Sequence, residues 1–167
     1  MQIHNHRLVP GGAIEPYVAS PNFSAGRMRP RYLLIHYTAG IDAAGAISWF
    51  QKDHANVSAH LVIDRDGKVT QMVDFDRVAW HAGKSQWGTL TSLNSHSIGI
   101  ELANAGRLEQ TGAGWRSSAG EAVPDDEVLE AAHRNEPYRE WGWQTFPKAQ
   151  LDAAAELLDK QLDRTLE

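Results

Sequence analysis

The sequence predicts a single-domain α/β fold in which a central mixed β-sheet is flanked by helices. Three observations support this prediction: apolar runs of strand length at residues 32–37 and 97–102, two segments with helical spacing of apolar residues, and an Asp-Gly dipeptide between two extended runs. The resulting order of strand, helix, hairpin, strand, loop and helix is typical of a mixed sheet. With 167 residues, 42% of them hydrophobic, the chain suits one domain with a single core.

The first half of the chain predicts an arm, a strand and a helix. Residues 1–30 are expected to form an N-terminal arm, because PNFSAGRMRPR has prolines, glycine and arginines without a sustained period. The folded domain is expected to cover residues 31–167. YLLIHY, residues 32–37, is a continuous apolar run, which favours a strand covered on both faces. Asp42 is a suitable N-cap for the helix that follows, whose apolar spacing ends at Phe50.

The middle of the chain predicts a hairpin, a second strand and a long loop. SAHLVIDRDGKVTQMV, residues 58–73, consists of two extended runs around Asp66-Gly67, a dipeptide that suits a tight hairpin turn. SIGIELAN, residues 97–104, predicts the next strand. The small and polar residues of 105–120 indicate a loop, and PDDEVLEAAH indicates a short helix that opens at Asp125.

The last segment predicts a helix with a core-facing stripe. Thr145 can cap this helix, and Pro147 suits its first turn. The residues expected to face the core are Leu151, Ala154, Ala155, Leu158 and Leu162.

Composition excludes several classes of function. The net charge is −5 and no Lys/Arg run is present, so we expect no nucleic-acid partner. The chain has no cysteine, which excludes a disulfide framework, a thiolate zinc site and a cysteine nucleophile within it. No G-x-S-x-G elbow supports a serine hydrolase. No apolar run approaches membrane-spanning length and the first residues lack a signal pattern, so we expect a cytoplasmic or externally delivered protein.

Two polar residues near strand ends are the main candidates for chemistry. His36 follows an apolar strand and precedes a small-residue turn, so it is either a catalytic group held at the lip of the sheet or a polar strand terminator. Glu101 has apolar neighbours, where desolvation raises a carboxyl pKa toward neutrality and favours general acid or base chemistry. The alternative is a strand glutamate that faces water by simple alternation.

Two further histidines have structural alternatives. In AWHAG, Trp80 and His81 stand beside Gly83, which suits a ligand with both polar and apolar faces, and a structural role for His81 stays open. His60 begins the hairpin, and we expect a partly buried, hydrogen-bonded strand residue rather than a functional one.

Four stretches in order resemble the type-2, zinc-dependent N-acetylmuramoyl-L-alanine amidases, a family related to phage lysozyme-type amidases and to peptidoglycan recognition proteins. They are LLIHYTAG, VSAHLVIDRDGKVTQMV, VAWHAG and NSHSIGIELAN. The resemblance is close over residues 31–104 and looser over EWGWQTFPKAQLDAAAELL near the C-terminus. It implies a central mixed sheet flanked by helices, peptidoglycan or muropeptide as substrate, and hydrolysis of the amide between N-acetylmuramic acid and L-alanine.

The resemblance also implies roles for individual residues. His36 matches the first zinc ligand of the family, and Glu101 matches the carboxylate that works on zinc-bound water. Zinc with three protein ligands keeps a position for that water and lowers its pKa. Ala59 departs from relatives that place an oxyanion-supporting tyrosine there. The residues that match the lining of the substrate cleft are Trp80, His81, Asn94 and Asn104.

The end of the chain departs from the family pattern. The family's second histidine ligand and its aspartate or cysteine ligand follow the final helix, and this sequence stops at Glu167 within or just after that helix. Three hypotheses follow: a fragment of an active amidase, a metal-free peptidoglycan-binding module, or an interaction domain that keeps only the scaffold. One ligand alone does not hold zinc at useful affinity.

Overall fold

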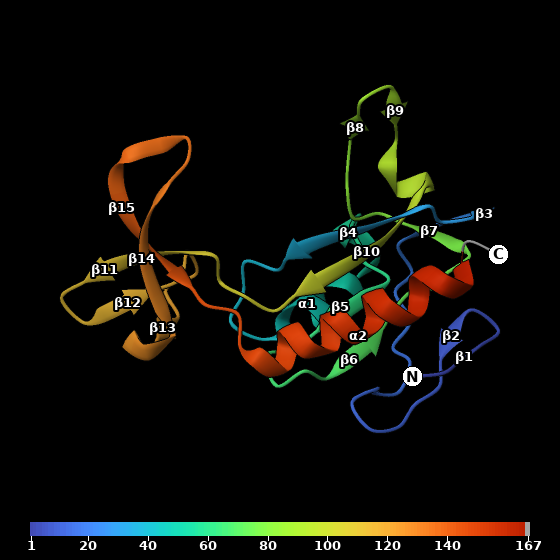
Figure 1. Cartoon of the computed structure of the whole chain (residues 1–167), viewed down its shortest axis with the longest axis horizontal. Coiled ribbons are helices and arrows are strands. Elements are labelled where there is room, and N and C mark those ends of the chain that lie inside the picture. Colours follow the sequence, from blue (N-terminus) through green and yellow to red (C-terminus); the bar gives the residue numbers. More distant parts are fainter. Residues whose placement is uncertain (166–167) are drawn as a thin grey trace.

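The computed structural model describes the backbone of residues 1–165 and the side chains of residues 1–159 (Figure 1). The helices are α1 (Ala43–Phe50) and α2 (Lys148–Thr165), with short 3₁₀ turns at Asp53–Ala55, Leu93–Ser95 and Asp125–Glu127. The strands are β1 (Ile3–His4), β2 (Arg7–Leu8), β3 (Phe23–Arg27), β4 (Tyr32–Tyr37), β5 (Leu61–Ile63), β6 (Val69–Gln71), β7 (Arg77–Ala79), β8 (Gln86–Trp87), β9 (Leu90–Thr91), β10 (Ser97–Leu102), β11 (Arg107–Thr111), β12 (Gly114–Arg116), β13 (Ala122–Val123), β14 (Val128–His133) and β15 (Glu136–Gln144).

A four-stranded mixed sheet forms the centre of the molecule, which confirms the predicted fold class. Its order is β4-β10-β5-β6, with β10 parallel to both β4 and β5, and β5 antiparallel to β6. α1 and α2 cover opposite faces of this sheet (Figure 1). Leu61 and Ile63 pack with Leu157 of α2, whereas Val62 packs with Phe50 of α1, because successive side chains of a strand point to opposite faces.

β4 lies at the edge of the central sheet, and several of its side chains are exposed. The prediction that this strand is covered on both faces was therefore wrong. Tyr32, Ile35 and Tyr37 of β4 are 40%, 49% and 51% exposed. β10 takes the central place instead, and every residue of β10 except Glu101 is buried. A continuous apolar run therefore marked two strands here, only one of which is enclosed by neighbours on both sides.

The hairpin and the first helix form as predicted. β5 and β6 are joined by the turn at Asp66-Gly67, where Gly67 has a φ of +86°. At α1, the Asp42 side chain accepts a hydrogen bond from the backbone N–H of Gly45 at 3.1 Å, as expected of an N-cap.

The final helix forms, but its buried face differs from the predicted stripe. Gln150, Ala154 and Leu157 are buried, whereas Leu151 is 48% exposed and Ala155 is also exposed. Leu158 is partly buried, and the side chain of Leu162 lies outside the described residues. The predicted stripe is confirmed at Ala154 and wrong at Leu151 and Ala155. A polar residue, Gln150, takes a core position instead: its Nε2 donates to the carbonyls of Ile63 and Ala103, each at 3.0 Å.

The start of α2 also differs in detail. The helix begins at Lys148, directly after Pro147. The hydroxyl of Thr145 donates to the carbonyl oxygen of Glu127 at 3.1 Å, so it ties the helix entrance to a neighbouring turn.

The segment predicted as a long loop and a short helix is a second sheet, so that prediction was wrong. Five antiparallel strands in the order β13-β12-β11-β15-β14 form a lobe that projects from the central sheet (Figure 1). Only the turn Asp125–Glu127 is helical, and Val128–His133 pairs with β15. Some of the residues that indicated a loop, such as Thr111 and Gly114, lie in strands, because pairing between distant segments overrides the local pattern.

Residues of the N-terminal arm pack on the free edge of β6. The backbone N–H groups of Glu15 and Val18 donate to the carbonyls of Val69 and Gln71 at 2.9 and 3.0 Å. Leu8 and Ile14 are buried in the main core, and β3 pairs with β7. Neither helix within the described part of the chain has the length and apolar character required to span a bilayer.

We predict that Gly67→Ala destabilises the protein by about 2–4 kcal/mol, because it combines an unfavourable positive φ with overpacking. A Cβ at this position would lie 2.7 Å from the carbonyl oxygen of Ala149. Urea unfolding measures the change.

Two matched substitutions separate the contributions. Gly88 has a φ of +59°, but no atom lies within 4 Å of a Cβ built on it. Gly112 also has open space around such a Cβ, and its φ is not positive. The matched variants are Gly88→Ala and Gly112→Ala. We expect a loss of about 1 kcal/mol for the first and little change for the second. Equal losses for all three variants would contradict the role assigned to the contact with Ala149.

Candidate active site

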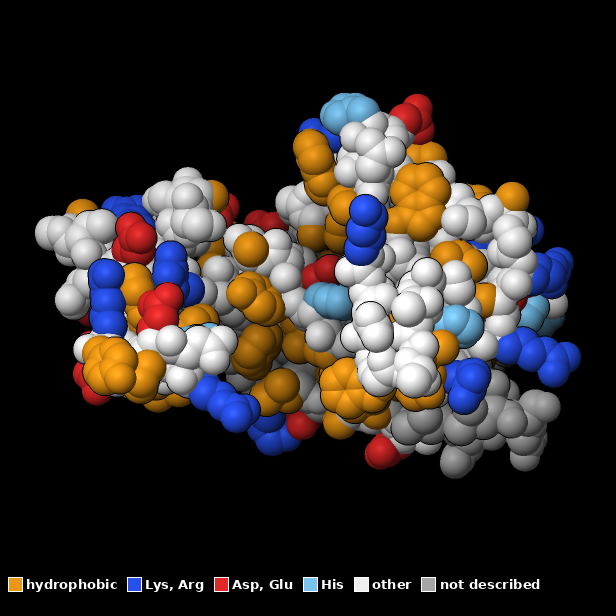
Figure 2. Space-filling view, turned by 90° about the horizontal axis from the view of Figure 1, so that it is seen from above, with side chains coloured by type: hydrophobic (Ala, Val, Ile, Leu, Met, Phe, Trp, Pro, Cys, Tyr) orange, Lys and Arg blue, Asp and Glu red, His pale blue; other side chains and the backbone are white. Residues whose placement is uncertain are grey.

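A cavity of about 360 Å³ opens between α1 and the carboxyl ends of β4 and β10. Figure 2 shows a hollow beside the lobe of the second sheet, with acidic and histidine side chains visible inside it. The cavity is lined by Tyr37, Thr38, Gly40, Ile41, Asp42, Gly45, Ala46, Trp49, Phe50, Val57, Ser58, Trp80, His81, Glu101 and Glu121.

Parallel pairing brings the two main candidate residues together. Glu101 on β10 lies directly opposite His36 on β4 and opposite Val62 on β5. Residues paired in this way across parallel strands project to the same face, which here is the face covered by α1. Two residues 65 positions apart thus share one edge of the sheet, where α/β proteins commonly bind ligands.

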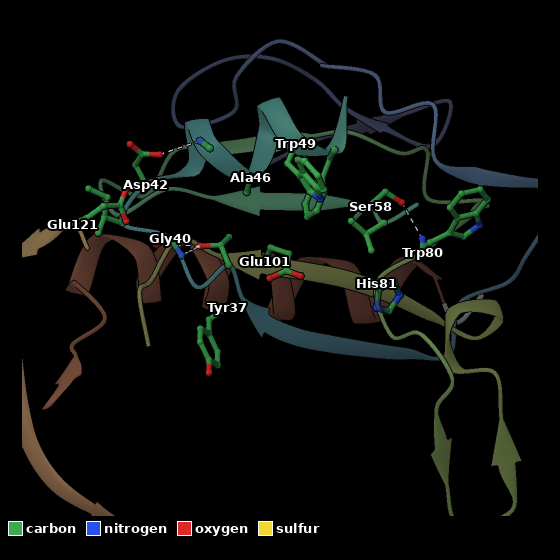
Figure 3. Close-up of a pocket in the computed structure, with 15 residues that line it drawn as sticks. Tyr37, Gly40, Asp42, Ala46, Trp49, Ser58, Trp80, His81, Glu101 and Glu121 are labelled. Atoms are coloured by element: carbon green, nitrogen blue, oxygen red, sulfur yellow. Dashed lines mark hydrogen bonds between the residues drawn. The ribbon is translucent and has the colours of Figure 1, made fainter. Parts of the chain in front are cut away.

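Glu101 faces the cavity rather than bulk water. Figure 3 shows its carboxyl group below α1, with Tyr37 on one side and His81 on the other. Its Oε2 is buried and has no hydrogen-bond partner among the described residues. Burial raises the pKa of Glu101 to about 7, so the carboxyl group exchanges protons readily near neutral pH.

His36 is half-buried near the end of β4 and contacts a second histidine. Its Nε2 lies 3.1 Å from Nδ1 of His81, and the two rings meet edge to face. Burial lowers the pKa of His36 below its usual value. The strand therefore ends on an imidazole that has a specific partner.

His81 lies against the sheet in a gap provided by a glycine. A Cβ on Gly99 would lie 2.2 Å from Cγ of His81, so only glycine admits the ring there. Burial, followed by the proximity of His36, lowers the pKa of His81 to about 4.

The ring of His60 lies 5.9 Å from the ring of His81, and His60 is hydrogen-bonded within the fold, as predicted, although it precedes β5. It is fully buried: its Nδ1 accepts from the Gly99 N–H at 3.0 Å, and its Nε2 lies 2.9 Å from the carbonyl oxygen of Arg77. Burial lowers its pKa to about 3, so it is neutral at physiological pH. Both ring nitrogens are thereby used within the fold.

The four residues matched to a substrate cleft fall into two groups. Trp80 and His81 line the cavity, and the Trp80 indole N–H donates to Ser24 Oγ at 3.0 Å. Asn94 and Asn104 are not among the lining residues. Their side chains hold backbone segments instead, Asn94 at 81–82 and Asn104 at 106 and 144–145.

Several lining residues had no signal in the sequence. Glu121 reaches the cavity from the second sheet, where its carboxylate accepts from Ser117 Oγ at 3.1 Å. Trp49 lies on α1 and Tyr37 on β4. Ala59, where relatives of the family place an oxyanion-supporting tyrosine, is fully buried and does not line the cavity. These placements depend on how the elements pack, which no local pattern records.

The fold and the site define a class of protein: an α/β domain with an acid–base cleft at the carboxyl edge of a mixed sheet. Comparison with known families specifies it further. The family model described as N-acetylmuramoyl-L-alanine amidase matches residues 26–166. The chain belongs to this family, which confirms the resemblance seen in the sequence.

Curated relatives carry the same description. The 1,6-anhydro-N-acetylmuramyl-L-alanine amidase AmpD of Escherichia coli is 41% identical over 83 residues, covering 50% of this chain and 45% of the relative. AmpD of Citrobacter freundii is 36% identical over 118 residues, covering 70% and 54%. The chain spans about half the length of the curated relatives it matches.

A solved structure supports the fold assignment. The amidase AmiD of Escherichia coli, in complex with anhydro-N-acetylmuramic acid-L-Ala-D-γ-Glu-L-Lys, matches with a TM-score of 0.59 and 27% identity, covering 85% of this chain and 46% of that one. AmpDh3 of Pseudomonas aeruginosa matches with a TM-score of 0.54 and 24% identity, covering 84% and 48%, and shows the same fold.

The family is zinc-dependent, so the donor set can be tested against this metal. Among the side chains that the structure describes, no group of three His, Asp or Glu residues is placed to hold a metal ion. His36 is the one described residue for which the family resemblance implies a ligand role. The described residues by themselves therefore do not fit a complete zinc site.

The raised pKa of Glu101 predicts a pH-dependent effect of Glu101→Gln on stability. The native carboxyl binds its proton more tightly than the unfolded one, so ionisation destabilises the native state as pH rises from about 4.5 to 7. We expect the free energy of unfolding of the variant to exceed that of wild type by on the order of 1 kcal/mol at about pH 8 and by little at about pH 4. This figure allows for the partial exposure of the side chain.

Urea unfolding at the two pH values measures this gain. Glu109→Gln, on the exposed surface of the second sheet, controls for the loss of one negative charge. A gain for Glu101→Gln that is the same at both pH values would argue against a buried, proton-exchanging carboxyl.

Proposed function

We propose that this chain acts in hydrolysis of the amide bond between N-acetylmuramic acid and L-alanine in peptidoglycan fragments. The observation that carries the proposal is Glu101, a carboxyl with a pKa of about 7 in an open cavity of an amidase-family chain. The substrate named in the AmiD complex contains this linkage, which supports the same class of substrate here.

Glu101 is the proposed acid–base residue. With both protonation states populated near neutrality, it can accept a proton from the attacking water and return it to the leaving amine. Its Oε2, which has no hydrogen-bond partner in the described part of the chain, is a buried acceptor for such a proton.

Substrate binding is proposed for Trp80 and His81, which line the cavity. An indole face suits the apolar face of a sugar ring, and the hydrogen bond to Ser24 holds that indole in place. Asn94 and Asn104 would act indirectly, through the backbone segments that they hold.

His36 is proposed as one ligand of a zinc ion, as its family position implies. Residues 31–167 are proposed as the amidase-like domain, with residues 1–30 as an arm packed on it. We attribute the shape of the site to the domain. The arm contributes to the stability of the domain, because its backbone pairs with the edge of β6.

A second candidate function is a peptidoglycan-binding module without catalysis. It is favoured by the absence of a three-donor group among the described side chains. This function needs the cavity and its aromatic lining but neither zinc nor the proton transfer of Glu101.

We predict that any cleavage of N-acetylmuramoyl-L-alanyl-D-isoglutamine by the chain incubated with zinc falls in kcat by about 10²-fold or more on Glu101→Gln. Chromatography of the released peptide measures cleavage, with Glu109→Gln as the matched control. Saturable binding of the same compound by calorimetry, without cleavage, would instead establish the binding module. The absence of both binding and cleavage would overturn both functions.

We predict that any zinc that the chain takes up during dialysis against zinc is lost in His36→Ala, because the family resemblance makes His36 a ligand. Elemental analysis measures the zinc content. His4→Ala, an exposed histidine on β1, is the matched control and should retain the metal. Essentially no zinc in the wild-type chain would reject His36 as a zinc ligand of this chain.

A further inference from the structure

The hydrogen bonds around His81 determine which of its nitrogens carries the proton. Nε2 of His81 lies 3.3 Å from Ser97 Oγ and 3.4 Å from the Ser97 carbonyl oxygen. The Ser97 hydroxyl donates its own proton to the Leu93 carbonyl, 2.7 Å away. Both Ser97 atoms can therefore only accept from His81, so Nε2 must be the protonated nitrogen.

The position of that proton assigns the role of His36 in the pair. In its neutral form the His81 imidazole has one N–H, which the contacts with Ser97 place on Nε2. Its Nδ1 is consequently an acceptor, and the group 3.1 Å away, Nε2 of His36, must donate. The reverse arrangement would turn an unprotonated Nε2 of His81 toward two acceptors.

We propose that His81 is a positioning residue for His36: it accepts the Nε2–H of His36 and thereby fixes that ring with Nδ1 as its unprotonated nitrogen. The pair itself follows from the contacts of the two rings. Its consequence for catalysis rests on the proposed function, because Nδ1 is then the nitrogen through which His36 would act there. Imidazole ligands commonly have their second ring nitrogen held in this way.

The surroundings of His81 support a rigid acceptor. Asn94 Oδ1 accepts from the backbone N–H groups of His81 and Ala82 at 3.1 and 2.7 Å. Gly99 leaves the space that the ring occupies. Three residues of one stretch thus position His81. Asn94 binds its backbone, Ser97 accepts its Nε2 proton, and Gly99 leaves room for its ring.

The pair can be observed directly by NMR of the full chain labelled with ¹⁵N, without added metal. We expect a scalar coupling across the hydrogen bond from Nε2 of His36 to Nδ1 of His81, with both histidines in the Nε2–H form. A proton on Nδ1 of either ring, or an absent coupling in the well-dispersed spectrum of the folded protein, would overturn the proposal.

Variants separate positioning from simple structural support. In His81→Ala the Nε2–H of His36 loses its acceptor, so we expect faster exchange of that proton with water. In His81→Asn the side-chain oxygen takes the place of Nδ1, so exchange should return toward the wild-type rate. Equal exchange rates in the two variants would contradict the acceptor role, even if both fold.

A kinetic measurement connects the pair to the proposed hydrolysis. We expect His81→Ala to lower kcat about 10-fold or more, with substantial recovery in His81→Asn. Equal losses in the two variants would contradict positioning through an acceptor. If no form of the chain cleaves substrate, the proposed function fails while the NMR coupling still decides whether the pair exists.

Discussion

β10 pairs in parallel with β4 on one side and with β5 on the other, and the arrangement of the site depends on this double pairing. It sets His36 opposite Glu101 at one edge of the sheet, although 64 residues separate them in the sequence. It also encloses β10, so that Glu101 is partly desolvated and its pKa rises. One constraint on the backbone thus determines both the geometry and the acidity of the main candidate residue.

Buried polar groups maintain that constraint where strands and loops meet. Gln150 ties α2 to the backbone at Ile63 and Ala103, and Asn104 ties the end of β10 to the strand that enters α2. His60 bridges β10 and β7 through its two ring nitrogens. Satisfied polar groups of this kind specify a single arrangement of the core, since the loss of one partner leaves the other buried and unpaired.

The second sheet adds a wall to the cavity without changing its centre. Its lobe is built around Leu108, Trp115 and Val123, a small core separate from that of the central sheet. Glu121 extends from this lobe into the cavity that holds Glu101. The residues proposed for chemistry therefore lie on the rigid central sheet, whereas part of the lining comes from a separate packing unit, which is a common division between scaffold and recognition.

The sequence by itself determined the mixed α/β class, the hairpin at Asp66-Gly67 and the choice of His36 and Glu101, because apolar periodicity, turn chemistry and ordered motifs are local signals. Only the tertiary structure decided that β4 is an edge strand, that residues 107–144 form a sheet, and that His81 contacts His36. These features depend on pairing between distant segments, whose energy comes from neighbours that a local window does not contain. The direction of the hydrogen bond proposed between the two histidines belongs to the same category, since it depends on acceptor atoms of Ser97 and Leu93.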